Sequence, residues 1–136
     1  MNLALAARVA AAGCLATSGV IHAQLYLHGY RTIPGVGPAF LLQASGALVV
    51  ALLLLLTATV VPRLIAAGLA LGALGGFAAS RTIGIFGFIE YGLQPAPQAL
   101  ISVFVEIAAL GLLMIGTTRE GSGKGWLILL WRYLPP

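Results

Sequence analysis

Four long apolar runs, separated by short segments that hold most of the charged residues, limit what this chain can fold into. The runs cover residues 9–27, 39–61, 64–89 and 98–116. Each is close to or above the roughly 20 residues that a helix needs to cross a bilayer. Lipid leaves no partner for unpaired backbone groups, so such runs cross it as helices. The sequence therefore predicts an all-α membrane protein, a four-helix transmembrane bundle with up-down-up-down topology.

The composition agrees with this class. Of 136 residues, 60% are hydrophobic and 7% are charged, whereas soluble domains have about 45–50% and about 25%. We expect one domain, with the transmembrane bundle in residues 1–118 and a cytoplasmic linker and interfacial tail in residues 119–136. The aromatic segment Trp126–Tyr133 is too short to span a membrane and is typical of a segment lying on its surface.

The start of the chain has features of a cleaved leader, since Arg8 precedes an apolar stretch and Cys14 follows a small-residue triplet. The charge before the stretch is weak, and the interval between Arg8 and Cys14 is too short for the apolar core of a lipoprotein signal. We therefore expect this segment to stay as the first span.

The basic residues are distributed unevenly between the two ends of the expected bundle. One end carries Arg8, Arg63, Arg119, Lys124 and Arg132, and the other carries Arg31 and Arg81. Because basic residues gather on the cytoplasmic side, the sequence predicts a multi-pass protein of the plasma (inner) membrane with both termini in the cytoplasm. The net charge of +4 is explained by topology, and no nucleic-acid-binding motif accompanies it.

Small residues recur every four positions along the third run, at Gly68, Gly72, Gly76, Ser80 and Gly84. On a helix they form one stripe, a pattern typical of two backbones in close contact. We therefore predict a helix–helix contact along this stripe. Its partner is a helix of the same chain, a second copy in a homo-oligomer or another membrane subunit.

Strongly polar residues inside membrane spans are costly and are candidates for function. Each run contributes one: His22, Gln43, Arg81 and Glu106. At about 1.5 Å per residue, all four fall in the outer half of a bilayer core about 30 Å thick. They are therefore predicted to share one polar pocket, with Tyr26, four residues after His22, on the same helix face.

Glu106 has two interpretations. It is a proton carrier or cation site, or it is a structural group paired with Arg81 or hydrogen-bonded to His22. The structural role is favoured, because paired intramembrane charges often only hold bundles together. His22 likewise fits an interhelical hydrogen bond better than a haem or metal ligand.

No catalytic motif is recognisable: the chain contains no Asp, and Gly121–Gly125 lacks the preceding strand of a phosphate-binding loop. We therefore expect a non-enzymatic membrane subunit or accessory protein that packs against a larger partner, with no metal and no cofactor. Two alternatives stay open. One is a small proton-coupled transporter or ligand-binding bundle built on Glu106 and the outer pocket. The other is a haem- or quinone-binding redox subunit.

The segment from His22 to Gln43, HAQLYLHGYRTIPGVGPAFLLQ, combines a histidine, an aromatic residue, GYR, IP and a helix start FLLQ. It resembles a segment of the small, uncharacterised four-span membrane proteins common in actinobacteria. This resemblance covers about one sixth of the chain by that motif. It implies a helical bundle in an actinobacterial-type plasma membrane and implies no activity. In layout alone the chain is also similar to DoxX-like proteins.

Overall fold

The structure of the chain, a computed structural model, describes residues 2–120, with side chains for residues 2–115. Its helices are α1 (Leu3–Leu27), η1, a short 3₁₀ helix (Tyr30–Thr32), α2 (Val36–Leu56), α3 (Val60–Thr82) and α4 (Gln98–Glu120). Within the described residues there is no β-strand, only an isolated bridge between Ile85 and Phe88. The predicted all-α fold is confirmed. The expected interfacial segment, residues 126–133, lies outside the described residues.

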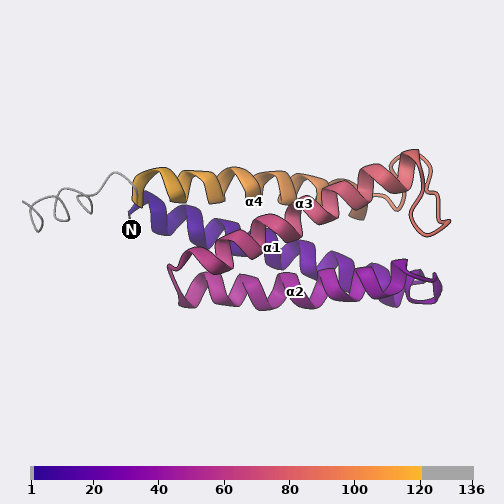
Figure 1. Cartoon of the computed structure of the whole chain (residues 1–136), viewed down its shortest axis with the longest axis horizontal. Coiled ribbons are helices and arrows are strands. Elements are labelled where there is room, and N and C mark those ends of the chain that lie inside the picture. Colours follow the sequence, from indigo (N-terminus) through magenta and orange to yellow (C-terminus); the bar gives the residue numbers. More distant parts are fainter. Residues whose placement is uncertain (1, 121–136) are drawn as a thin grey trace, which may run out of the picture.

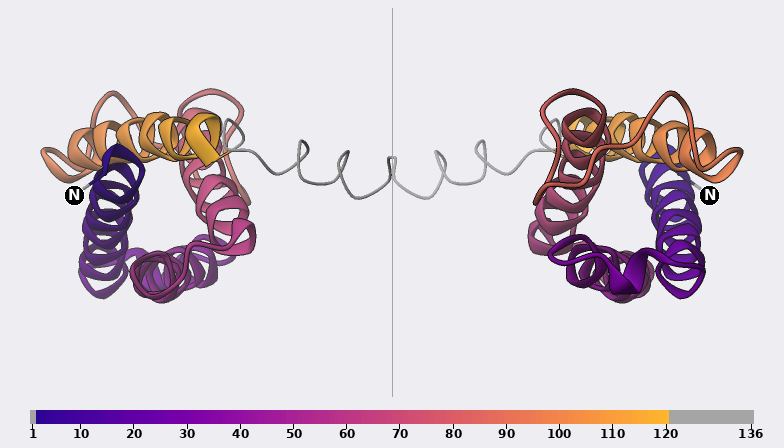
Figure 2. Two further views of the ribbon diagram at one scale, coloured as in Figure 1. Left: turned by 90° about the vertical axis from the view of Figure 1, so that its left-hand side faces the viewer. Right: turned by 90° about the vertical axis from the view of Figure 1, so that its right-hand side faces the viewer.

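The four α-helices alternate in direction (Figure 1). The start of α1 and the end of α4 lie at one end of the bundle, which we call the terminus end. The segments 28–35 and 83–97 lie at the other, which we call the loop end. Viewed along the bundle, α1 lies between α2 and α4, and α3 completes the ring (Figure 2). All four helices are long and apolar enough to cross a membrane, the architecture of a multi-pass integral membrane protein.

Two helix boundaries at the terminus end differ from the sequence prediction. α1 begins at Leu3, ahead of residue 9, because the Asn2 side chain caps it by accepting a hydrogen bond from the Leu5 N–H at 2.8 Å. The second and third apolar runs, 39–61 and 64–89, place the turn between them at Pro62 and Arg63, and this is wrong. α2 ends at Leu56, residues 57–59 form the connection, and Pro62 lies in the first turn of α3. Proline is tolerated there because the first-turn N–H groups have no partner in the helix.

The third helix is also shorter than predicted, since α3 ends at Thr82 although the apolar run continues to Ile89. Gly84 adopts a φ of 79°, and its N–H donates to the Ala79 carbonyl at 2.8 Å, which closes the helix end. A tight turn then pairs Ile85 with Phe88. The apolar segment 83–89 is therefore part of the loop end rather than of a span.

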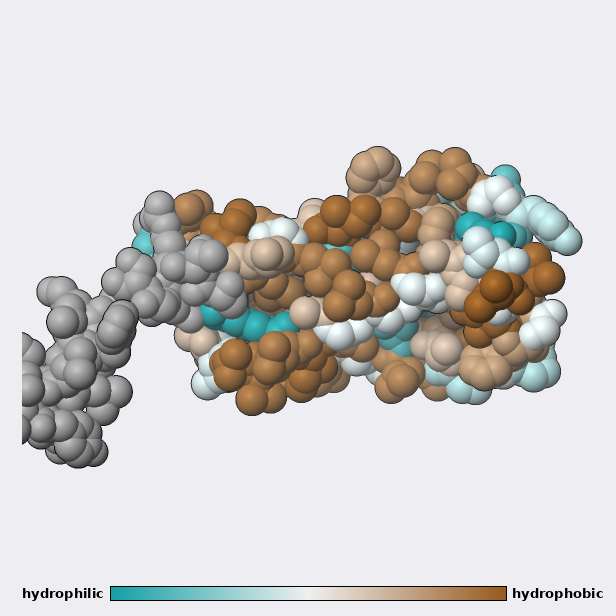
Figure 3. Space-filling view, turned by 45° about the horizontal axis from the view of Figure 1, so that its top comes forward, coloured by the Kyte–Doolittle hydropathy of each residue, from teal (hydrophilic) through white to brown (hydrophobic). Residues whose placement is uncertain are grey.

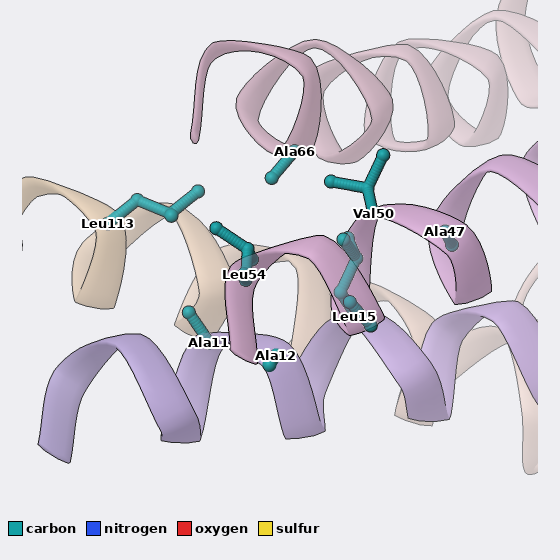
Figure 4. Packing of buried hydrophobic residues seen from close by; sticks show 9 residues of the cluster. Ala11, Ala12, Leu15, Ala47, Val50, Leu54, Ala66 and Leu113 are labelled. Carbon is teal, nitrogen blue, oxygen red and sulfur yellow. The ribbon is translucent and has the colours of Figure 1, made fainter. Parts of the chain in front are cut away.

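The hydrophobic core lies in the half of the bundle nearest the terminus end and consists mainly of small side chains. Figure 4 labels Ala11, Ala12 and Leu15 of α1, Ala47, Val50 and Leu54 of α2, Ala66 of α3 and Leu113 of α4. Each is at most 8% exposed. This half of the bundle is closely packed by residues from all four helices.

Among the described glycines of the four α-helices, Gly19 of α1 makes the closest approach to another α-helix. A Cβ placed there would lie 3.0 Å from Leu48 Cγ, 3.1 Å from the Ala44 carbonyl oxygen and 3.2 Å from Ala47 Cβ. α1 and α2 therefore touch through a glycine and two alanines, the type of contact that brings backbones together in membranes.

Candidate functional site

The half of the bundle nearest the loop end contains a cavity of about 570 Å³. All four α-helices, η1 and the segment 83–97 contribute to its walls. Of the residues predicted to share a pocket, His22, Gln43, Arg81 and Glu106 line this cavity, whereas Tyr26 is half-buried on α1 and does not. The space-filling view shows a mostly apolar outer surface with small hydrophilic areas between the helices (Figure 3).

Glu106 is the most deeply buried charged residue at this cavity, with 1% of its surface exposed. Its Oε1 atom accepts hydrogen bonds from the Ser18 hydroxyl at 2.8 Å and the Ser102 hydroxyl at 2.7 Å. Ser102 lies one turn before Glu106 on α4, whereas Ser18 reaches across from α1. The expected partners of Glu106 were Arg81 or His22. The structure gives it two hydroxyl donors instead.

His22 lies one turn after Ser18 on α1. Its Nδ1 atom is 2.9 Å from the Ser18 carbonyl oxygen, and a carbonyl can only accept, so Nδ1 carries a proton. In the neutral ring Nε2 then has a lone pair. The same Nδ1 is 3.4 Å from the Ser18 hydroxyl oxygen. Ser18 therefore contacts both residues, His22 through its backbone carbonyl and Glu106 through its hydroxyl, and the direct hydrogen bond between His22 and Glu106 expected from the sequence is not formed.

Gln43 of α2 is 9% exposed. Its side-chain nitrogen Nε2 is buried and has no hydrogen-bond partner among the described residues. A buried amide donor left unpaired costs about 1–3 kcal/mol. Because Gln43 lines the cavity, the cavity has a polar group whose hydrogen-bonding capacity is not used within the bundle.

Arg81 stands at the loop end and pairs with Glu90, with Nη2 and Oε2 3.5 Å apart. Its Nε donates to the Gly92 carbonyl at 2.7 Å, and its other nitrogens donate to Ser80, Phe77 and Gln94. The guanidinium carbon also lies 3.7 Å from the centre of the Phe77 ring. Arg81 therefore fastens the segment 83–97 to the end of α3.

Tyr30 of η1 joins this group, since its hydroxyl donates to Glu90 Oε1. Burial, together with the hydrogen bond to Glu90 and its negative charge, raises the pKa of Tyr30 above the ordinary value. Its ring stacks on Phe40 of α2, with centroids 4.6 Å apart. We call Tyr30, Arg81 and Glu90 the loop-end cluster. It connects both loop segments and covers the cavity at that end.

The small-residue stripe does not make the helix–helix contact predicted for it within this chain. Gly68, Gly72, Gly76 and Ser80 line the cavity, and Gly84 lies beyond the end of α3. A Cβ on Gly68 or Gly72 would meet no atom within 4 Å. These glycines therefore leave space in the bundle, because no other helix of the described chain packs against them.

The structure adds two site residues to those chosen from the sequence. Ser102 could have been found from its four-residue spacing to Glu106. Ser18 could not, because its role depends on how α1 and α4 face each other. Within residues 2–115, no group of three or more His, Cys, Asp or Glu side chains is placed to hold a metal ion.

Comparison of the chain with protein-family models, with curated proteins and with solved structures gave no match. The resemblance of the segment from His22 to Gln43 to actinobacterial four-span proteins stays a prediction.

Proposed function

We propose that this protein is a binding bundle of the membrane, which holds a small, mostly apolar molecule with a polar end in the loop-end cavity. Its volume of about 570 Å³ falls within the roughly 300–1,000 Å³ typical of small-molecule sites. Apolar side chains form most of its walls, and a few convergent polar groups, Gln43, His22 and Glu106, stand among them. That combination is usual for sites that orient an apolar ligand by one polar end.

The observation that carries this proposal is the unpaired Nε2 of Gln43. A polar atom buried among apolar helices without a partner opposes folding. A ligand whose polar end hydrogen-bonds to this amide would remove that cost, as an acceptor for its nitrogen or, after a half-turn of the last side-chain bond, as a donor to its oxygen. Access from the bilayer is available because Leu42 of α2 and Ile65 of α3 line the cavity and are 69% and 46% exposed.

Of the functions considered from the sequence, this proposal favours the ligand-binding bundle over the accessory subunit. The accessory role was based on the small-residue stripe, the apolar exterior and the absence of a catalytic motif, and three glycines of that stripe line the cavity. Transport would require this site to open to both sides of the membrane in turn. Association with another subunit or a second copy stays a prediction, which recovery of partners in mild detergent would test.

We expect Gly72→Leu to abolish ligand binding without destabilising the fold. A leucine there has room to enter the cavity, since a Cβ meets nothing within 4 Å, and leucine is favoured over glycine in a helix by about 0.8–1 kcal/mol. The measurement is binding of phenylbutanol to the full chain in mild detergent, detected by ligand-observed NMR against empty micelles, with thermal unfolding of the same samples.

Gly75→Leu is the matched control. Gly75 lies on the same helix, is exposed, also has free space around it and does not line the cavity. Gly75→Leu should stabilise the helix as much as Gly72→Leu does and should bind phenylbutanol as tightly as the original chain. If both leucine variants bind phenylbutanol equally well, the cavity is not the binding site.

We also propose the plasma membrane as the location, with the terminus end in the cytoplasm, on the basis of the basic residues counted above. In a Cys14→Ser background, Tyr91→Cys in the loop end should react with an impermeant maleimide in intact cells, since Tyr91 is 80% exposed. Ala58→Cys, exposed between α2 and α3, should react only after permeabilisation. The opposite labelling pattern would mean that the terminus end lies outside the cell and the proposed topology is wrong.

A further inference from the structure

The charged groups around the cavity do not balance. Arg81 and Glu90 neutralise each other across 3.5 Å. Glu106 has no cationic partner among the described residues, and its hydrogen bonds come from two neutral hydroxyls. The remaining titratable groups at the wall are His22, whose Nδ1 donates to a backbone carbonyl, and Tyr30, whose phenol donates to Glu90. If Glu106 is ionised, the cavity lacks one positive charge.

We propose that the molecule held in this cavity is a lipophilic monocation, an amine with an apolar body whose ammonium group is bound by Glu106. This rests on the proposed function and names the class of its ligand. A carboxylate away from water needs a proton or a cation. The hydroxyls of Ser18 and Ser102 both act on Oε1, so Oε2 has no hydrogen bond from the described residues and can accept one from an ammonium.

Other groups at the wall suit the same ligand. The Nε2 lone pair of His22 can accept an ammonium N–H. The amide of Gln43 can present its oxygen to a donor after a half-turn about its last bond. The rings of Phe40 and Phe88 line the cavity, and aromatic faces attract cations. The glycines of α3 leave room for the apolar body.

The test compares three molecules that carry a phenyl ring at one end of a four-carbon chain and differ in the polar group at the other end: phenylbutylamine, phenylbutanol and phenylbutyrate. Binding to the full chain in mild detergent should be about tenfold tighter for the amine than for the alcohol, a difference of about 1.4 kcal/mol. It should be weakest for phenylbutyrate. Glu106→Gln, which keeps an oxygen for both serine hydroxyls, should remove the advantage of the amine over the alcohol when both are measured on that variant.

A pH series on the unaltered chain supplies a second measurement that does not depend on the folding of the variant. Protons and the amine compete for Glu106, so amine binding should weaken as the pH falls, whereas alcohol binding should not. A pH dependence that persists in Glu106→Gln would assign the effect to His22 and overturn the inference.

The two proposals fail in different ways. If the alcohol binds as tightly as the amine, or phenylbutyrate binds best, the cation inference is wrong and the binding function stands. If none of the three binds the unaltered chain, and Gly72→Leu changes nothing, both proposals are wrong.

Discussion

Gly19→Leu should lower the free energy of unfolding by about 3 kcal/mol, the upper part of the usual range for overpacking a closely packed interior. The reason is steric: the first added carbon already lies 3.0 Å from Leu48 Cγ and 3.1 Å from the Ala44 carbonyl oxygen. The carbonyl belongs to the backbone of α2, so it cannot turn aside as a flexible side chain can. The helices must separate, and the contact of α1 with α2 is lost.

Gly13→Leu is the control on the same helix. Gly13 is exposed, and a Cβ there meets no atom within 4 Å. It should therefore be neutral or slightly stabilising, because leucine is the better helix former. Thermal unfolding in detergent, followed by circular dichroism and by size-exclusion profile, measures both variants. Equal stability of the two would mean that Gly19 is not at a tight contact.

The sequence predicted the number of spans and their alternating direction because apolar length alone determines both. It did not predict where α3 ends, because hydropathy does not distinguish an apolar helix from an apolar turn. Ile83 to Ile89 are apolar in either conformation. The end of the helix is determined by the positive φ of Gly84 and its bond to the Ala79 carbonyl.

The glycines illustrate a second limit. A residue without a side chain either admits a neighbouring backbone or leaves a space, and spacing along one helix cannot distinguish the two. The regular series on α3 borders a cavity, whereas Gly19, which belongs to no such series, makes the close contact. Which outcome occurs depends on how the facing helix is positioned.

Four of the five polar residues chosen from the sequence line one cavity. The partners expected for them differ from those in the structure. Opposite charge favoured a pair between Arg81 and Glu106, but the long arginine side chain reaches toward the loop end, where it forms an ion pair with Glu90 and donates to the carbonyls of Gly92 and Gln94. Loop conformation, which brings Glu90 back to α3, is not encoded in the apolar pattern.

Arg81→Gln should have a comparably large effect, lowering the free energy of unfolding by about 3 kcal/mol. The two side chains of the pair are only 13% and 17% exposed, so removing the cation leaves Glu90 poorly solvated. The carbonyls of Gly92 and Gln94 lose their donor as well. The segment 83–97 should then detach from α3, which limited proteolysis in vesicles would detect as faster cleavage at the loop end.

Arg81→Lys separates charge from geometry, because lysine keeps the positive charge but lacks the planar fork that serves Glu90, Gly92 and Gln94 together. It should recover only part of the stability lost in Arg81→Gln. The double variant Arg81→Gln with Glu90→Gln should also be more stable than Arg81→Gln alone, since no unpaired carboxylate remains and Tyr30 can still donate to the amide oxygen. If lysine restores full stability, charge alone holds the loop end. If the double variant is no more stable than Arg81→Gln, the loss comes from the carbonyl contacts and not from the ion pair.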